Sequence, residues 1–226
     1  MGRVQKRIPE RNNQVLVVND KADMGKSYYL PFTFIGPKTE DHSILFENPK
    51  SISLIVFTGG ADVSPHLYDE PIGRHTYSNT DRDNEEIRIF NQAVKENIPM
   101  FGICRGLQFL TVMQNGKLVQ HSEGHHQSHK IQTIDKFEFQ VTSSHHQMVL
   151  PSNHDDIIAW SSPKLSKFYL NGLNQKITTE LEVEVVKFNK IKAVGVQYHP
   201  EIMNQETYGF FYVEDLIRRY LPSAVS

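Results

Sequence analysis

Cys104 is the only cysteine among the 226 residues. The apolar run before it, 100–103, predicts a buried strand, and the leucines at 107 and 110 repeat at helical spacing after it. Glycines at 102 and 106 permit a tight turn between the two. A side chain on such a turn projects above a sheet, where the N–H groups that open the helix favour a thiolate. Cys104 is therefore a candidate nucleophile, with a buried apolar thiol as the alternative.

A histidine and a carboxylate follow the last predicted strand, 193–198. Pro200 fixes the local backbone and keeps His199 extended. Residues two apart in an extended segment point to the same side, so Glu201 can reach back to His199. Such a pair can work as an oriented general base beside a nucleophile.

Two glycines, Gly59 and Gly60, end the apolar strand predicted over 52–57. They allow the backbone to turn N–H groups inward, which is one way to build an oxyanion hole. An ordinary turn at the end of a strand is the alternative. Asp62, which follows, is expected to organise this loop rather than to act in catalysis.

Histidine is concentrated in residues 121–129, where four of the nine residues are histidines. A metal site, a polar pocket rim and a solvated loop are the alternatives. Gly124 argues against a helix that would align His121 with His125, and no carboxylate spacing completes a ligand set. We therefore expect a pocket rim or a solvated loop, and neither a metal nor another cofactor.

Composition narrows the range of functions. With 24 basic and 26 acidic residues, the formal net charge is −2, so no overall field would recruit nucleic acid or a membrane surface. One cysteine can form neither an internal disulfide nor a cysteine-based zinc site, which suits the reducing cytoplasm. Residues 1–13 are basic, and no apolar segment follows them. We expect a flexible tail there, without signal peptide or anchor, and one folded domain over 14–226.

The order of elements predicts an α/β protein. Nearly all-apolar runs predict buried strands at 14–18, 52–57, 100–103 and 193–198. A helix is expected from Asp83 to Asn97, and an amphipathic closing helix over 205–220. Alternation over 130–142 and 181–188, and an apolar run at 157–160, predict antiparallel strands, whereas 21–36 has no clear periodicity. A mixed sheet follows, with its sites beyond the carboxyl ends of the parallel strands.

Five motifs of this chain resemble, in their residues and in their order along the chain, the class I glutamine amidotransferase-like family. Residues 102–108 (GICRGLQ) and 195–201 (GVQYHPE) carry that resemblance. Residues 59–68, Arg82-Asp83 with Glu86, and 145–147 are similar to its γ-glutamyl-γ-aminobutyrate hydrolase branch. The resemblance implies a flavodoxin-like three-layer sandwich, with a mostly parallel central sheet and an antiparallel extension.

The same resemblance implies a Cys-His-Glu triad of Cys104, His199 and Glu201 that hydrolyses a γ-glutamyl amide through a thioester. Backbone N–H groups of Gly60 and Arg105 would hold the oxyanion. The remaining implied oxyanion and substrate contacts are Gly59, Gln108, Ser144, His145 and His146. The expected partner is a small γ-glutamyl amide or glutamine, with a homodimer or a transient synthetase complex also considered. The alternative function is a glutaminase subunit that delivers ammonia to a separate synthetase.

Two departures from the family pattern concern specificity. The family often has Gly-Gly where this chain has Asn115-Gly116, and the hydrolase branch commonly has Asn-Ser where this chain has Thr142-Ser143. Neither change touches Cys104, His199 or Glu201. They leave the identity of the leaving amine open.

Overall fold

The computed structural model describes residues 13–19 and 25–225. The tail predicted over 1–13 lies, except for residue 13, outside the described residues. Within the described ranges no helix is both long and apolar enough to cross a membrane.

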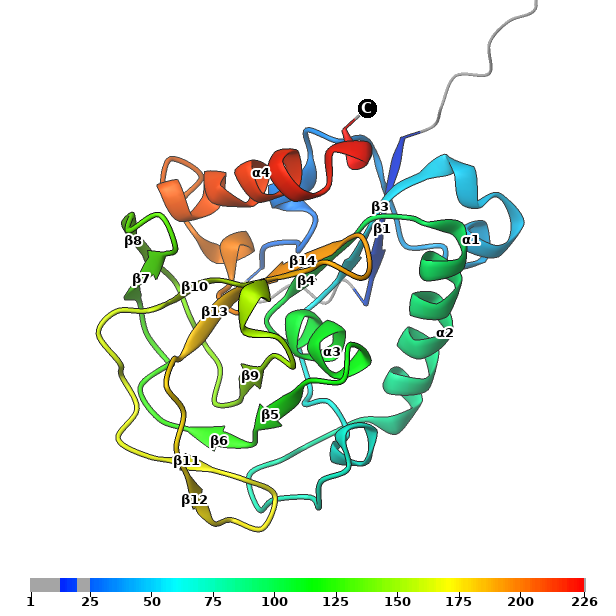
Figure 1. Cartoon of the computed structure of the whole chain (residues 1–226). Helices are drawn as coiled ribbons and strands as arrows, with labels where there is room; N and C mark the ends of the chain where they lie inside the picture. The colour runs from blue at the N-terminus through cyan, green and yellow to red at the C-terminus, as the bar shows by residue number, and fades with distance from the viewer. Residues whose placement is uncertain (1–12, 20–24, 226) are drawn as a thin grey trace, which may run out of the picture.

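A nine-stranded sheet in the order β2-β1-β3-β4-β14-β13-β10-β7-β8 forms the centre of the molecule (Figure 1). The strands from β2 to β14 pair in parallel, and those from β14 to β8 pair antiparallel. This is the predicted mixed sheet. Its strands are β1 (Gln14–Val18), β2 (Lys38–Thr39), β3 (Ile52–Phe57), β4 (Met100–Ile103), β7 (His129–Thr133), β8 (Glu138–Val141), β10 (Ile157–Ser161), β13 (Val183–Phe188) and β14 (Ala193–Val196).

Helices cover both faces of this sheet, which gives three layers (Figure 1). α4 (Tyr208–Tyr220) packs on one face through Val213, Leu216 and Ile217. α2 (Thr80–Glu96) and α3 (Arg105–Met113) pack on the other. Consecutive residues of β1 alternate between the two cores, Val15 and Val17 on one side and Leu16 and Val18 on the other. The buried apolar strands therefore separate two cores, as a sheet covered on both faces requires.

Two helices begin at residues other than those predicted. α2 begins at Thr80, not Asp83, because the Asn79 side chain accepts a hydrogen bond from the Arg82 amide (3.1 Å) and caps the helix. It ends as predicted at Asn97, which is in the left-handed conformation. α4 begins at Tyr208 rather than at 205, because Asn204 forms a turn by accepting from the Glu206 amide.

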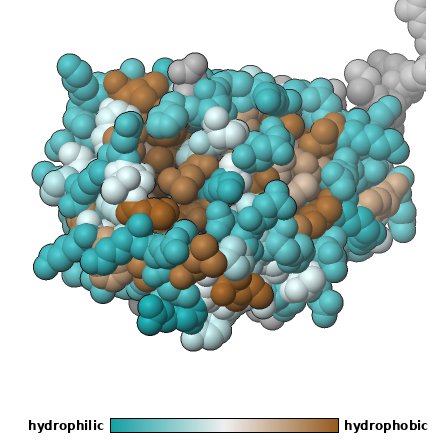
Figure 2. Space-filling model, turned by 60° about the horizontal axis from the view of Figure 1, so that its bottom comes forward, coloured by the Kyte–Doolittle hydropathy of each residue, from teal (hydrophilic) through white to brown (hydrophobic). Residues whose placement is uncertain are grey.

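Several short elements were not predicted. They are β2, the helix α1 (Ser43–Glu47), and five further strands in two small sheets: β5 (Lys117–Val119) pairs with β9 (Met148–Leu150), while β11 (Tyr169–Leu170) lies between β6 (His121–Ser122) and β12 (Lys176–Ile177). Elements of two to five residues carry too little periodicity to be read from sequence. The small sheets lie below the central sheet in Figure 1, and Figure 2 shows hydrophilic residues around separate apolar patches on that side.

Candidate active site

Cys104 lies at the turn between β4 and α3, as predicted. Its backbone is strained, with φ 50° and ψ −107°, a combination that side-chain-bearing residues rarely adopt. The Cys104 amide donates to the carbonyl of Val196 on β14 (2.8 Å), and the Cys104 carbonyl accepts from the Gln108 amide (3.1 Å). Both strand and helix therefore hold the turn that presents the sulfur.

The glycines on either side of Cys104 are required by close packing. A Cβ added to Gly102 would lie 2.5 Å from the backbone nitrogen of Leu107. One added to Gly106 would lie 2.0 Å from the carbonyl oxygen of Phe57 on β3. No side chain fits at either place, because the obstructing atoms belong to the backbone. The glycine spacing thus brings the start of α3 directly against the sheet.

His199 and Glu201 lie at the end of β14, the strand that pairs with β4. Nδ1 of His199 and Oε1 of Glu201 are 2.7 Å apart, and both side chains are buried. The predicted local geometry was wrong, because Glu201 belongs to a 3-10 turn, Pro200–Ile202, rather than to an extended segment. The expected contact forms nevertheless, since the turn also folds the carboxylate back to the imidazole.

The His199 imidazole also interacts electrostatically with the Cys104 side chain. Nδ1 of the same ring faces Glu201. Burial lowers the pKa of His199, but Cys104 and Glu201 together outweigh it and raise the pKa well above its usual 6.5. Cys104 and Glu201 thus both favour a protonated imidazole at His199.

The loop after β3 lies against the same imidazole. A Cβ on Gly59 would be 3.1 Å from Cε1 of His199 and 2.4 Å from the Tyr28 hydroxyl. Gly60 has φ +128°, and a Cβ there would meet Nη1 of Arg82 at 2.3 Å. Asp62 accepts from the Tyr77 amide at 2.8 Å, which is the loop-organising contact expected of it. Gly59 is therefore needed for the approach of this loop to His199, and Gly60 for the positive φ beside Arg82.

Arg105, the first residue of α3, ties this loop to the turn at Cys104. Its guanidinium is buried, donates to the Ala61 carbonyl (3.2 Å) and pairs with Asp83 and Glu86 of α2. Burial lowers the pKa of Arg105 to about 9, with Asp83 acting in the opposite direction, so the group stays charged at neutral pH. Three elements are joined by this single buried cation.

The other predicted contact residues are placed differently from one another. Nε2 of Gln108 donates to the Gln147 carbonyl (3.3 Å) and to Gln197 (3.4 Å), so its side chain is buried under the site. Ser144 is exposed.

The two histidines that follow Ser144 differ in their surroundings. His146 is half-buried, with Nε2 at 3.4 Å from Oδ1 of Asp62. His145 turns both ring nitrogens toward protein groups, Gln147 O and Glu184. Their proposed substrate contacts stay predictions.

The structure confirms the expected pocket rim for His121 and Glu123, which line a hollow, and corrects the expectation for two other histidines of residues 121–129. His125 is fully buried and His129 nearly so, whereas a pocket rim or a solvated loop was expected. The physical reason is Glu184 on β13, a buried carboxylate that both imidazoles face. Only part of the segment is open to solvent, and His126 is exposed.

Two side chains near the site were missed by sequence reasoning. Tyr28 comes from a segment without periodicity, and its ring centroid lies 6.3 Å from that of His199. Arg82 was noted only as part of a motif, yet its guanidinium donates to the Thr58 carbonyl (3.0 Å) and pairs with Glu86 (2.7 Å) beneath Gly60. The Arg82-Asp83…Glu86 spacing, which puts one face of α2 under the loop, was the available signal.

Comparison with known proteins identifies the class. The fold matches that of a solved glutamine amidotransferase from Thermotoga maritima with a TM-score of 0.55 at 16% identity, covering 93% of this chain and 89% of that one. The chain is 31% identical over 165 residues to the glutamine amidotransferase-like protein YvdE of Lactococcus lactis. The alignment spans 66% of each protein, so the chain covers slightly less than two thirds of the length of YvdE. This α/β protein therefore has the glutamine amidotransferase class I fold.

The family can be stated more closely. Residues 30–201 match the model of Peptidase C26, and the chain belongs to that family. It is also 29% identical over 174 residues to the γ-glutamyl-γ-aminobutyrate hydrolase PuuD of Escherichia coli, covering 70% of this chain and 67% of that protein. The resemblance to this family stated from the sequence is confirmed.

Proposed function

We propose that this protein is a cysteine-dependent hydrolase of γ-glutamyl amides. The observation that carries the proposal is the placement of Cys104, His199 and Glu201 at the ends of adjacent parallel strands, with His199 bonded to Glu201 and electrostatically coupled to Cys104. Nucleophile, base and orienting carboxylate in that order are the groups that acyl transfer needs. A reaction that depends on a free thiol suits a reducing compartment such as the cytoplasm.

In the proposed reaction the Cys104 sulfur attacks the γ-carbonyl carbon and forms a tetrahedral intermediate. His199, protonated at Nε2, gives that proton to the leaving nitrogen as the C–N bond breaks, which leaves a γ-glutamyl thioester. His199 then takes a proton from water, which attacks the thioester and releases glutamate. Glu201 accepts a hydrogen bond from Nδ1 throughout and holds the ring in orientation.

The negative oxygen of the intermediate would be held by backbone N–H groups of Gly60 and Arg105. Gly60 lies on the loop that contacts His199 through Gly59, and Arg105 directly follows the nucleophile. Both donors are fixed in advance, because the Arg105 side chain is anchored on Ala61, Asp83 and Glu86. Preorganised donors of this kind are worth about 100-fold or more in rate each.

The leaving amine would extend toward a hollow of about 480 Å³ on the side of His146. A series of contacts leads there: His146 lies near Asp62 (3.4 Å) and near His121, whose ring stacks on His75 at 4.0 Å between centroids. Arg74, Lys176 and one carboxylate, Glu123, also line the hollow. The two cations outnumber this carboxylate and favour an amine that itself carries a carboxylate, such as γ-aminobutyrate, over ammonia.

A glutaminase that delivers ammonia to a synthetase is the second candidate, favoured by the glutamine amidotransferase-like name of YvdE and by the shared fold. Turnover of γ-glutamyl-γ-aminobutyrate and of free glutamine by the purified chain separates the two. Hydrolysis of the first substrate without a partner, abolished in Cys104→Ala, supports the hydrolase. Turnover of glutamine alone, only after a synthetase is added, would support the rival. No turnover of either by a folded chain would contradict both.

A further inference from the structure

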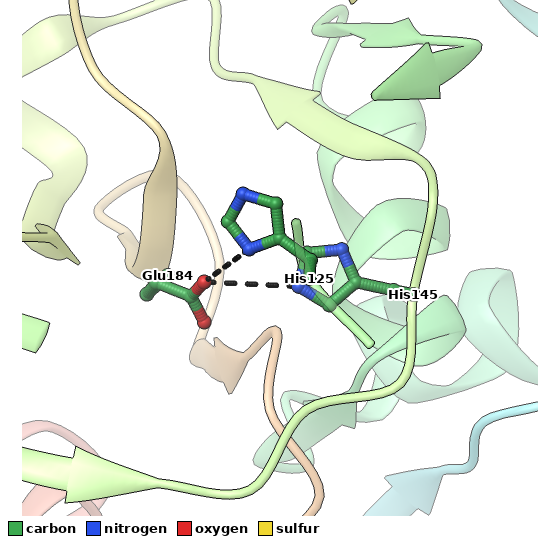
Figure 3. A group of neighbouring side chains, drawn as sticks. All are labelled: His125, His145 and Glu184. Carbon is green, nitrogen blue, oxygen red and sulfur yellow. Dashed lines mark ion pairs between the residues drawn. The ribbon is translucent and has the colours of Figure 1, made fainter. Parts of the chain in front are cut away.

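A second cluster of ionisable side chains lies beside the proposed active site. It consists of His125, His145 and Glu184, which come from three separate segments of the chain, and all three are buried. Figure 3 shows the two imidazole rings and the carboxylate turned toward one another. One ligand atom from each lies within 4.8 Å of the others. None of the three takes part in the proposed bond-making and bond-breaking steps, and His145, which the resemblance makes a substrate contact, turns both ring nitrogens toward protein groups.

Hydrogen bonding does not satisfy this cluster. Buried polar atoms without a hydrogen-bond partner include both nitrogens of His125, Nε2 of His145 and Oε2 of Glu184. Leaving several such atoms unpaired inside a protein is costly. Two arrangements would satisfy these atoms: an imidazolium of His125 between Glu182 and Glu184, which lie 3.3 and 3.4 Å from its nitrogens, or a bound cation shared by the cluster.

The protonation of His145 indicates which kind of group would occupy the cluster. Nδ1 of His145 lies 2.9 Å from the carbonyl oxygen of Gln147, which can only accept, so Nδ1 carries the proton. Nε2 of a neutral His145 then points a lone pair at Oε1 of Glu184, 3.7 Å away. A lone pair that faces a carboxylate oxygen is repulsive unless a cation lies between them.

We propose that His125, His145 and Glu184 bind a divalent transition metal ion, with zinc as the best match. A tetrahedral zinc ion with ligands at about 2.0–2.1 Å separates neighbouring ligand atoms by about 3.3 Å. Nδ1 of His125 and Oε1 of Glu184 are 3.4 Å apart, and Nε2 of His145 and the same oxygen are 3.7 Å apart. Two imidazoles and one carboxylate form a donor set that suits zinc, and Oε2 of Glu184 or a water completes it.

The surroundings are those of an oriented metal site. Nε2 of His125 faces Oε2 of Glu182 at 3.3 Å, so the ring would connect a carboxylate to the metal. Glu182 is itself fixed by the Leu165 and Ser166 amides, both at 2.7 Å, and by the Tyr169 hydroxyl at 2.9 Å. His129 hydrogen-bonds Oε1 of Glu184 from another side, at 2.9 Å. Each donor is therefore held by a partner behind it.

A metal here would fix the segment that supports the active site. The Thr142 carbonyl accepts from the His199 amide (2.9 Å), and the Gln147 carbonyl accepts from Gln108 (3.3 Å). His145 lies between these two residues. The site is thus expected to be structural, with no substrate access, and to stabilise residues 142–147.

Metal content of the untagged full chain tests the proposal. The protein is produced in zinc-supplemented culture, measured by elemental analysis, stripped with a chelator and titrated with Co²⁺. We expect one zinc per chain, the visible absorption of tetrahedral cobalt, and a melting temperature that rises with added zinc. Glu184→Gln should abolish the cobalt spectrum, and Glu182→Gln should weaken affinity about 10–100-fold. His126→Ala, at an exposed histidine of the same segment, is the matched control and should bind as the parent does.

The proposal does not depend on how the variants fold, because the parent protein alone can overturn it. A parent chain that is metal-free as purified and gives no cobalt spectrum would show that the cluster is a proton-charged network, with an imidazolium of His125 between Glu182 and Glu184. Metal binding that survives in Glu184→Gln, or is lost in His126→Ala, would equally overturn it. Circular dichroism establishes that each variant compared is folded.

Discussion

Nδ1 of His199 lies 2.7 Å from Oε1 of Glu201, although Pro200, the first residue of a 3-10 turn, separates the two residues. Glu201→Gln keeps the size of the side chain but replaces the carboxylate. We expect kcat for γ-glutamyl amide hydrolysis to fall by about 10³–10⁴-fold, because the imidazole loses its orientation and the partner of its charged form. Steady-state kinetics measure this fall in kcat, and Glu206→Gln, at an exposed glutamate, is the control. A loss below about threefold would exclude Glu201 from this role.

The raised pKa of His199 makes a prediction about pH. A histidine whose folded pKa lies above its unfolded value of about 6.5 contributes stability that is fully present below that value and is lost as pH rises through the folded pKa. Cys104 is the main cause that raises this pKa. In Cys104→Ala the loss should therefore be smaller and be complete at a lower pH than in the parent. Denaturant unfolding as a function of pH, with NMR titration of His199, tests this. If the pKa of His199 is the same in Cys104→Ala as in the parent, Cys104 is not the group that raises it.

The buried cation at the start of α3 predicts a large stability effect. Arg105→Ala leaves the buried carboxylates of Asp83 and Glu86 without their common partner. We expect a loss of about 3–5 kcal/mol in the free energy of unfolding. Arg218→Ala is the control, because its pair with Glu214 is exposed and is worth about 0.2–1 kcal/mol. Equal effects of the two substitutions would contradict the anchoring role.

The oxyanion loop can be tested at Gly60. Gly60→Ala introduces a Cβ that meets Arg82 at a backbone φ of +128°. We expect stability to fall by about 1–3 kcal/mol and activity by about 10²–10³-fold. Gly25→Ala is the matched control, because Gly25 also has a positive φ (+77°) but no atom from the described part of the chain lies within 4 Å of the added Cβ. If Gly25→Ala reduces activity as much, backbone strain rather than the oxyanion donor explains the result.

The hollow beside His146 predicts a specificity change. Replacing Arg74 and Lys176 together with alanine should raise KM for γ-glutamyl-γ-aminobutyrate about tenfold or more, because the amine loses the partners of its carboxylate. KM for glutamine, which lacks that group, should stay the same. A parallel rise for both substrates would indicate a general disturbance and remove the hollow from the specificity argument.

Part of this organisation could be predicted from the sequence, because its signals are local. The apolar runs that became β1, β3, β4 and β14 mark buried strands, and the glycines around Cys104 mark a turn that only they permit. Glu201 was correctly paired with His199, but through the wrong backbone conformation. Proline restricts one residue and does not determine the turn that follows.

The missed features depend on contacts between distant segments. His125 and His129 are buried because Glu184, more than fifty positions later, lies on a strand beside them. Nothing in residues 121–129 shows that partner. Tyr28 reaches His199 from a segment without periodicity, so only the folded chain brings the two rings together. Burial of polar side chains is decided by tertiary packing, which local patterns do not encode.

The most direct test of the proposed chemistry is to trap the acyl-enzyme. The purified chain is mixed with a γ-glutamyl amide, quenched in acid and digested, and the peptide containing Cys104 is examined by mass spectrometry. We predict a mass increase of one glutamyl group on Cys104, more abundant in His199→Ala if that variant still acylates, and absent in Cys104→Ala. Turnover of the amide with an unmodified Cys104 at every quench time, and full activity of Cys104→Ala, would contradict a thioester mechanism.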